Sequence, residues 1–123
     1  MAKPSQGNWL LLKRLARYLI GAPRLVHLFE WQSQDNHLCV YTDSDWAGDK
    51  SSRKSTSGGI AFVGGHAVKS WSSNQSIIAL SSAEAELYAL LKGASQALGL
   101  QSMAADFGDT VNVGLYSDAS AGL

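Results

Sequence analysis

The sequence predicts an α/β domain with a mixed β-sheet, in which three antiparallel strands are followed by a parallel strand after a crossover helix. Three strand-like segments follow one another with no helical segment between them, so neighbouring strands should run antiparallel. A long helical segment then precedes a fourth strand, and a right-handed crossover would return that strand parallel. A purely parallel, doubly wound sheet is excluded, because residues 59–72 leave no room for a helix.

The chain is expected to begin with a helix over residues 8–20. Asn8 can cap this helix, and apolar residues recur along it at helical spacing, with three basic residues mostly on the other face. Gly21 would end the helix. A short strand is then expected over residues 25–31, and a polar turn is expected over residues 32–36.

The strands of the sheet come next. Residues 37–43 are rich in Val, Tyr and Thr and predict a strand that ends in a carboxylate. A polar loop over residues 47–58 follows it. Residues 59–63 and 67–72 predict two further strands, and the Gly64–Gly65 pair between them is typical of a tight hairpin.

The longest predicted helix covers residues 82–98. Ser81 and Glu84 match the capping box, in which a serine and a glutamate satisfy backbone donors at a helix start. Gly99 should end or kink the helix, with a further turn or two up to Phe107. The apolar residues expected to line its buried face are Leu87, Leu90, Leu91, Ala94 and Leu98.

Three acidic residues should meet at one edge of this sheet. Asp43 ends the first strand of the sheet, Glu86 lies in the first turns of the crossover helix, and Asp118 ends a strand predicted over residues 111–117. Ends of neighbouring parallel strands form a ligand crevice, where carboxylates repel one another unless they hold divalent cations. Oxygen-only ligands favour Mg²⁺ or Mn²⁺ over zinc. Taken singly, each acid is more simply a solvated residue at the end of an element.

Neighbouring acids compete for these positions. Glu84 has a structural place in the capping box, which leaves Glu86 available for a ligand. Asp45 shares the side of Asp43 only if the strand continues, and Asp49 lies in the loop. Both therefore rank below Asp43.

Composition and charge limit the function classes. The chain has 123 residues, 46% apolar and 16% charged, which suits one folded domain. One cysteine and three scattered histidines argue against a disulfide framework or a zinc module. No apolar run approaches the ~20 residues that span a bilayer, and no secretory leader precedes the domain, so we expect a soluble intracellular protein with no membrane partner, cytoplasmic or nuclear.

The charges suggest a nucleic-acid partner. Residues 1–31 carry five basic residues and one acidic residue, whereas residues 70–123 carry one basic and five acidic. This asymmetry fits nucleic acid together with a cation site, although chance explains it about as well. Five residues of the loop region are expected to contact a phosphate backbone or to stack on a sugar or base: Lys50, Arg53, Lys54, Ser55 and Trp46. A solvated loop is the alternative.

Four motifs follow one another in the order of a known family. They are Tyr41–Asp49 (YTDSDWAGD), Ser52–Gly58 (SRKSTSG), Ser70–Ser73 (SWSS) and Ala79–Leu87 (ALSSAEAEL). Together they resemble the ribonuclease H domain of copia-type retrotransposon Pol polyproteins. The helix at Trp9–Gly21 is similar to the last helix of the preceding reverse transcriptase region. The resemblance implies that residues 1–36 are the tail of that region and residues 37–123 a ribonuclease H-like domain.

The resemblance also implies a function. It places the catalytic and metal-binding acids at Asp43, Glu86 and Asp118, with two Mg²⁺ ions for which Mn²⁺ can substitute. The family cuts the RNA strand of RNA–DNA hybrids during reverse transcription, beside the reverse transcriptase part of the same polyprotein. The sequence departs from the family pattern at Gly59, where an aromatic is common, and at Ala83, where threonine is common.

The family's last strand, its following helix and a fourth metal-site residue would lie beyond Leu123, so the resemblance implies a domain incomplete at its C-terminus. We expect weak activity or none, because those elements brace the site. Two alternatives stay open. One is an inert fragment of the same fold, and the other, from a different class, is a phosphoacceptor signalling domain that gathers acids and Mg²⁺ at strand ends.

Overall fold

The computed structural model describes residues 5–24, 26–33 and 35–118. The chain divides into two compact units, one ending at Glu30 and the other beginning at Trp31. The residues after Asp118, in which the sequence suggests the start of a further helix, lie outside the described residues.

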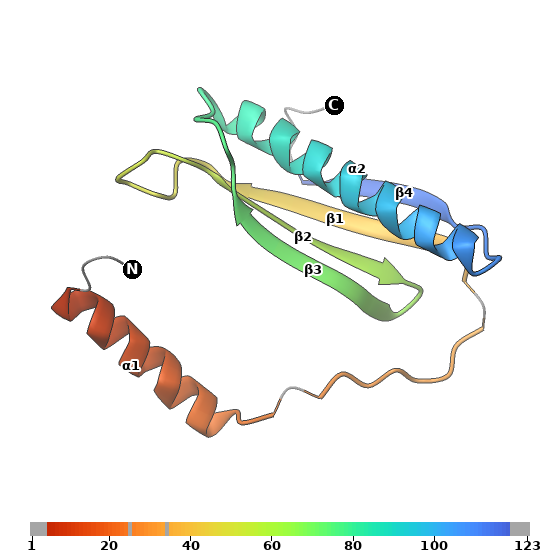
Figure 1. Ribbon diagram of the computed structural model, residues 1–123, viewed down its shortest axis with the longest axis horizontal. Helices are drawn as coiled ribbons and strands as arrows, with labels where there is room; N and C mark the ends of the chain where they lie inside the picture. Colours follow the sequence, from red (N-terminus) through yellow and green to blue (C-terminus); the bar gives the residue numbers. More distant parts are fainter. Residues whose placement is uncertain (1–4, 25, 34, 119–123) are drawn as a thin grey trace. The chain divides into compact units, whose positions relative to one another are not determined.

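Helix α1 (Gln6–Gly21) makes up most of the first unit (Figure 1). It begins earlier than predicted, because Ser5 is the N-cap and its Oγ accepts a hydrogen bond from the Asn8 backbone N–H at 3.2 Å. The prediction that Asn8 caps the helix is therefore wrong. At the other end, the Ala22 N–H donates to the Tyr18 carbonyl at 2.9 Å. None of the residues of α1 is buried.

The second unit holds a mixed sheet of four strands, crossed on one face by one long helix (Figure 1). The strands are β1 (His37–Asp45), β2 (Thr56–Val63), β3 (His66–Asn74) and β4 (Asn112–Ser117), in the spatial order β3-β2-β1-β4. β1 pairs antiparallel with β2, β2 pairs antiparallel with β3, and β4 runs parallel to β1. This arrangement confirms the predicted fold class, which is consistent with a ribonuclease H-like fold.

The strand ends differ from the predicted ones. β1 continues to Asp45 and β2 starts already at Thr56, because these two residues pair with each other across the strands. Their polar composition hid this extension, which shortens the loop. The predicted hairpin is present, and Gly64 adopts a φ of +57°, a conformation that glycine reaches without strain.

The strand expected over residues 25–31 is absent from its described part, residues 26–31. A strand needs a paired neighbour, and the described residues of this stretch have none. The residue that follows it, Gln32, contacts the β2–β3 hairpin through its side chain. Gln32 donates from Nε2 to the Val63 carbonyl at 3.0 Å, and its Oε1 accepts from the Gly65 N–H at 2.9 Å. These bonds place the last residues before β1 in the same unit as the sheet.

Helix α2 (Ser82–Asp106) connects β3 to β4 and packs on β1, β2 and β4. Ser81 is the predicted N-cap, and its Oγ accepts from the Glu84 N–H at 3.2 Å. Glu84 Oε2 accepts from the N–H of Leu80 at 2.7 Å, one residue before the Ser81 N–H that a capping box uses. The helix does not end at Gly99. It ends where Gly108 takes a φ of +85° and donates to the Ala105 carbonyl.

The buried face of α2 consists of small residues. Ala85, Ala89, Gly93 and Ala97 face the sheet at four-residue intervals. Leu87, Leu91 and Leu98, which were expected on this face, are each more than half exposed, so the prediction is wrong for them. The other two residues expected there, Leu90 and Ala94, are half-buried. Size explains the difference: a Cβ at Gly93 would lie 2.3 Å from Thr42 Cγ2, so the helix lies too close to the sheet for large side chains.

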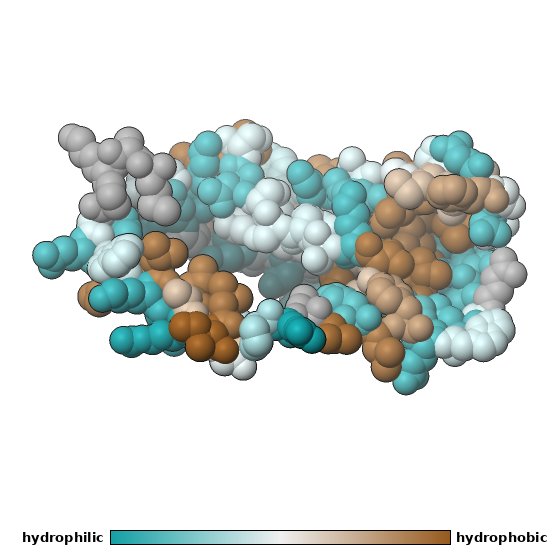
Figure 2. Space-filling model, turned by 60° about the horizontal axis from the view of Figure 1, so that its bottom comes forward, coloured by the Kyte–Doolittle hydropathy of each residue, from teal (hydrophilic) through white to brown (hydrophobic). Residues whose placement is uncertain are grey.

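Apolar side chains also occur on the surface of the described residues, as the brown areas of Figure 2 show. They include Leu87, Leu91 and Leu98 of α2 and several residues of α1. None of the helices in the described part of the chain is long and apolar enough to cross a membrane.

Replacing Gly93 with alanine is expected to lower the free energy of unfolding by about 1–2 kcal/mol, because the added methyl would overlap Thr42 and push α2 off the sheet. The better helix propensity of alanine, about 1 kcal/mol, offsets only part of this loss. Urea denaturation followed by circular dichroism measures the change.

Gly99→Ala is the matched control in the same helix. None of the described neighbours lies within 4 Å of its Cβ position, so this variant should gain up to about 1 kcal/mol. Equal stability of the two variants would mean that the closeness of α2 to the sheet does not limit side-chain size at Gly93.

Candidate metal centre

Strand register brings two acidic residues to the same edge of the sheet. Thr42 of β1 pairs with Ser117 of β4 in the parallel ladder. Asp43 directly follows Thr42, and Asp118 directly follows Ser117. Both acids therefore lie at the same end of the β1–β4 ladder. Glu86 belongs to the first turns of α2, which start at the same end of β1.

The three carboxylates lie close together. One oxygen each of Asp43, Glu86 and Asp118 lies within 4.8 Å of the others. Asp43 and Asp118 are exposed and Glu86 is half-buried. The expected proximity is therefore confirmed, while metal binding stays a prediction. The other predicted site residues are not part of this cluster.

The hydrogen bonds of Glu86 leave one of its oxygens available. Oε1 accepts from Ser44 Oγ at 2.7 Å. Oε2 is buried and accepts no hydrogen bond from the described residues. A buried carboxylate oxygen without a partner is costly, and a bound cation would relieve that cost.

The donor set fits a hard divalent cation. Three carboxylates offer only oxygen, the ligand that Mg²⁺ and Mn²⁺ prefer. Two oxygens that share one Mg²⁺ at ~2.1 Å lie at most about 4.2 Å apart. Separations of up to 4.8 Å therefore need only small side-chain adjustments.

Neighbouring acids have structural partners instead. The Asp45 carboxylate fills the space above Gly48, whose Cβ would lie 2.0 Å from Asp45 Oδ2. Asp49 accepts hydrogen bonds from the Ser52 hydroxyl and from both the hydroxyl and the N–H of Ser51. These bonds, the Ser52 bond first, hold the pKa of Asp49 well below its usual range. β1 continues to Asp45, so the condition under which Asp45 shares the side of Asp43 is met, and that reason for ranking it lower is wrong. Asp45 still lies over Gly48 and is not part of the carboxylate cluster.

The loop between β1 and β2 carries the predicted nucleic-acid contacts. Lys50 and Arg53 are exposed and Lys54 is half-buried. Trp46 is 46% exposed, and its indole N–H donates to the Ala79 carbonyl at 3.1 Å. The loop thus presents two cations and one aromatic ring at its surface.

Ser55 was expected to contact phosphate, and this expectation is wrong. Its side chain is fully buried, and its Oγ accepts from the Ala47 N–H at 3.0 Å. Its carbonyl accepts from the Gln75 N–H at 2.8 Å. Ser55 holds the loop in place, a role that its position in a serine-rich run gave no sign of.

Ser44, whose hydroxyl donates to Glu86, is a residue of this site that was not predicted from the sequence. The signal was present in the alternation of β1, because Val40 and Thr42 are buried under α2 and Ser44 is the next residue on that face.

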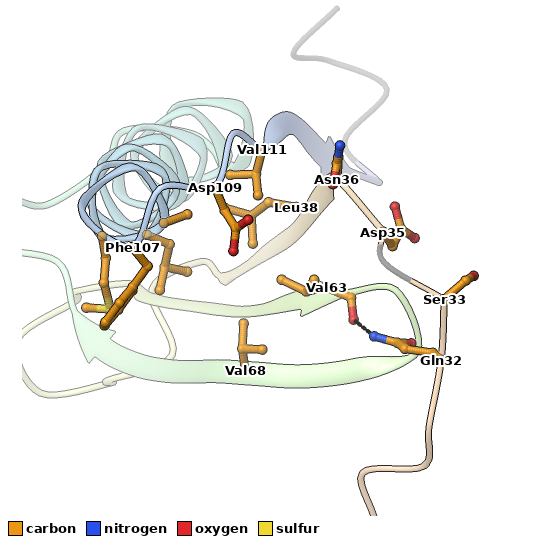
Figure 3. Close-up of a pocket in the computed structure, with 13 residues that line it drawn as sticks. Gln32, Ser33, Asp35, Asn36, Leu38, Val63, Val68, Phe107, Asp109 and Val111 are labelled. Atoms are coloured by element: carbon orange, nitrogen blue, oxygen red, sulfur yellow. Dashed lines mark hydrogen bonds between the residues drawn. The ribbon is translucent and has the colours of Figure 1, made fainter.

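A separate pocket lies at the opposite end of the sheet (Figure 3). It has a volume of about 490 Å³ and lies among Leu38, Val63, Val111 and the end of α2. None of the three acids of the cluster, Asp43, Glu86 and Asp118, lines it. They lie instead on an open edge, which suits a large polymeric substrate better than a small enclosed ligand.

Fold and cluster together define an α/β domain with an acidic centre at the end of paired parallel strands. The chain is 36% identical over 110 residues to the retrovirus-related Pol polyprotein from transposon RE2 of Arabidopsis thaliana, and equally to that from transposon RE1 of the same plant. Each match covers 88% of this chain and 7% of the polyprotein. The chain belongs to the family of copia-type retrotransposon Pol polyproteins.

A further relative is the secreted RxLR effector protein 161 of Plasmopara viticola, which is 38% identical over 97 residues, covering 79% of this chain and 68% of that protein. No family model matches the chain. No solved structure matches it. The descriptions of the two plant relatives name a polyprotein and no single domain of it.

Asp43→Asn is expected to leave the metal-free chain equally stable or to raise its melting temperature by up to about 4 °C. The change removes one of three mutually repelling charges, and the asparagine oxygen can still accept from the Ser44 N–H. Thermal denaturation with excess EDTA measures the effect. A clear loss of stability would identify Asp43 as a structural residue.

Asp49 should contribute to the acid sensitivity of the fold. Because its pKa is lowered in the folded chain, its stabilising effect is complete above the unfolded value of 3.8 and is lost as the pH falls through the folded value. The stability difference between the chain and Asp49→Asn should therefore be largest near pH 5 and shrink toward pH 2. Urea midpoints at several pH values measure it, and a constant difference would contradict this account.

Proposed function

We propose that the sheet-containing unit is a ribonuclease H-like domain that hydrolyses the RNA strand of RNA–DNA hybrids with the help of divalent cations. The observation that carries the proposal is the convergence of Asp43, Glu86 and Asp118 from three different elements, with oxygens within 4.8 Å. The order of the motifs and the membership in a Pol polyprotein family support the same activity.

In this proposal the three acids hold the cations. When bound, Mg²⁺ or Mn²⁺ supplies an activated water and stabilises the leaving oxygen of a phosphodiester. β1 and β4 fix Asp43 and Asp118 through their ladder, and α2 fixes Glu86 through packing on the sheet. The chain's own contribution is a rigid, negatively charged edge of defined geometry.

The loop after β1 would bind the nucleic-acid backbone. Lys50 and Arg53 are exposed a few residues beyond Asp43, and Trp46 offers a half-exposed ring. Contacts of cations with phosphates position a duplex without reading its sequence. Selection of RNA over DNA then falls to the 2′-hydroxyl of the cleaved strand.

The proposed partner within the same polyprotein is reverse transcriptase. Residues 1–36 would be the tail of that region, with α1 as its last helix.

Cleavage of a labelled hybrid tests the proposal. The chain with Mg²⁺ or Mn²⁺ should cut the RNA of an RNA–DNA hybrid at a low but measurable rate, in line with the weak activity expected from its sequence, and leave double-stranded DNA intact. Asp43→Asn, Glu86→Gln and Asp118→Asn should each lower the rate by about 100-fold or more, since loss of even an outer partner of a ligand costs 10–100-fold. Product analysis on denaturing gels measures the rates.

Asp106→Asn is the matched control, because this exposed acid ends α2 far along the helix from Glu86. Its rate should not change. Cleavage that survives in Asp43→Asn or in EDTA would contradict the proposal. Metal binding without cleavage would favour the inert fragment, and transfer of phosphate from acetyl phosphate to Asp43 would favour the phosphoacceptor class.

A further inference from the structure

One residue contacts two of the three carboxylates. The backbone N–H of Ser44 donates to Asp43 Oδ1 at 2.8 Å. Its hydroxyl donates to Glu86 Oε1 at 2.7 Å. Ser44 therefore joins an acid of β1 to an acid of α2 through two separate hydrogen bonds.

Strand geometry explains why this hydroxyl reaches α2. Side chains alternate between the two faces of a strand, and Leu38, Val40 and Thr42 are buried on the side that α2 covers. Ser44 is the next residue on that face and is half-buried. It meets the first turns of the helix, where Glu86 lies.

The bond from Ser44 also determines how Glu86 is presented. A glutamate side chain has three rotatable bonds, and holding one oxygen removes much of their freedom. With Oε1 held by Ser44, Oε2 remains buried and accepts no hydrogen bond from the described residues. In this held conformation one Glu86 oxygen lies within 4.8 Å of an oxygen of Asp43 and of Asp118, so Glu86 is part of the carboxylate cluster.

We infer that Ser44 is a positioning residue of the metal centre, which orients Glu86 for the cation through its hydroxyl; this inference rests on the proposed function. Neither an apolar side chain nor glycine at this position could donate that bond. The competing explanation is that Ser44 only ties β1 to α2, and it predicts a loss of stability without a specific loss of metal affinity.

Titration of the full metal-free chain with Mn²⁺ in a calorimeter tests the inference. Ser44→Ala should weaken Mn²⁺ binding about tenfold, the lower end of the effect of removing an outer partner of a metal ligand. Ser44→Thr keeps the hydroxyl and should bind within about threefold of the unsubstituted chain. Ser70→Ala, an exposed serine of the edge strand β3, should change nothing.

Melting temperatures in EDTA are measured for every variant. If Ser44→Ala does not fold, Ser44→Cys takes its place, since a thiol has similar volume and is a weak donor. If Ser44→Ala keeps its Mn²⁺ affinity while Asp43→Asn loses Mn²⁺ binding, the inferred role of Ser44 is overturned, but the proposed metal centre is not. Failure of threonine to restore the affinity would do the same. Absence of Mn²⁺ binding by the unsubstituted chain would overturn both this inference and the proposed metal centre.

Discussion

The close approach of α2 to the sheet is the constraint on which the rest of the unit depends. Gly93 lies against Thr42 with no room for a side chain. Glu86 precedes Gly93 by seven residues, two helical turns, and so lies on nearly the same side of the helix about 10 Å further toward its start. The close contact between Gly93 and Thr42 therefore also determines how far Glu86 lies from the sheet edge where β1 and β4 end.

Much of the fold could be predicted from local patterns. The order of strands and helix gave the mixed sheet, and the Ser81–Glu84 pair gave the start of α2. The buried face of α2 could not be predicted, because hydropathy ranks leucine above alanine and carries no information on the distance between helix and sheet. The supposed strand around residues 25–31 failed for a related reason, since strand-like composition does not supply a pairing partner.

The residues of the candidate site also fall into those that could be predicted from the sequence and those that could not. Asp43, Glu86 and Asp118 could be placed from element order, because the carboxyl ends of neighbouring parallel strands lie at the same edge of a sheet. Ser44 and Ser55 could not, because serine is common in turns and strands and only three-dimensional neighbours reveal what its hydroxyl contacts. Whether a polar side chain can contact a ligand or instead hydrogen-bonds to the backbone depends on its burial, and the sequence composition does not reveal burial.

The anchoring of the loop after β1 has a consequence for local opening of the domain. The Trp46 indole N–H donates a hydrogen bond to the carbonyl of Ala79. Ser55 accepts hydrogen bonds from the backbone N–H groups of Ala47 and Gln75. The loop and the segment leading into α2 therefore share their hydrogen bonds, although they lie far apart in the sequence. Such segments open together rather than one at a time, so their amide protons should exchange with solvent as one cooperative unit.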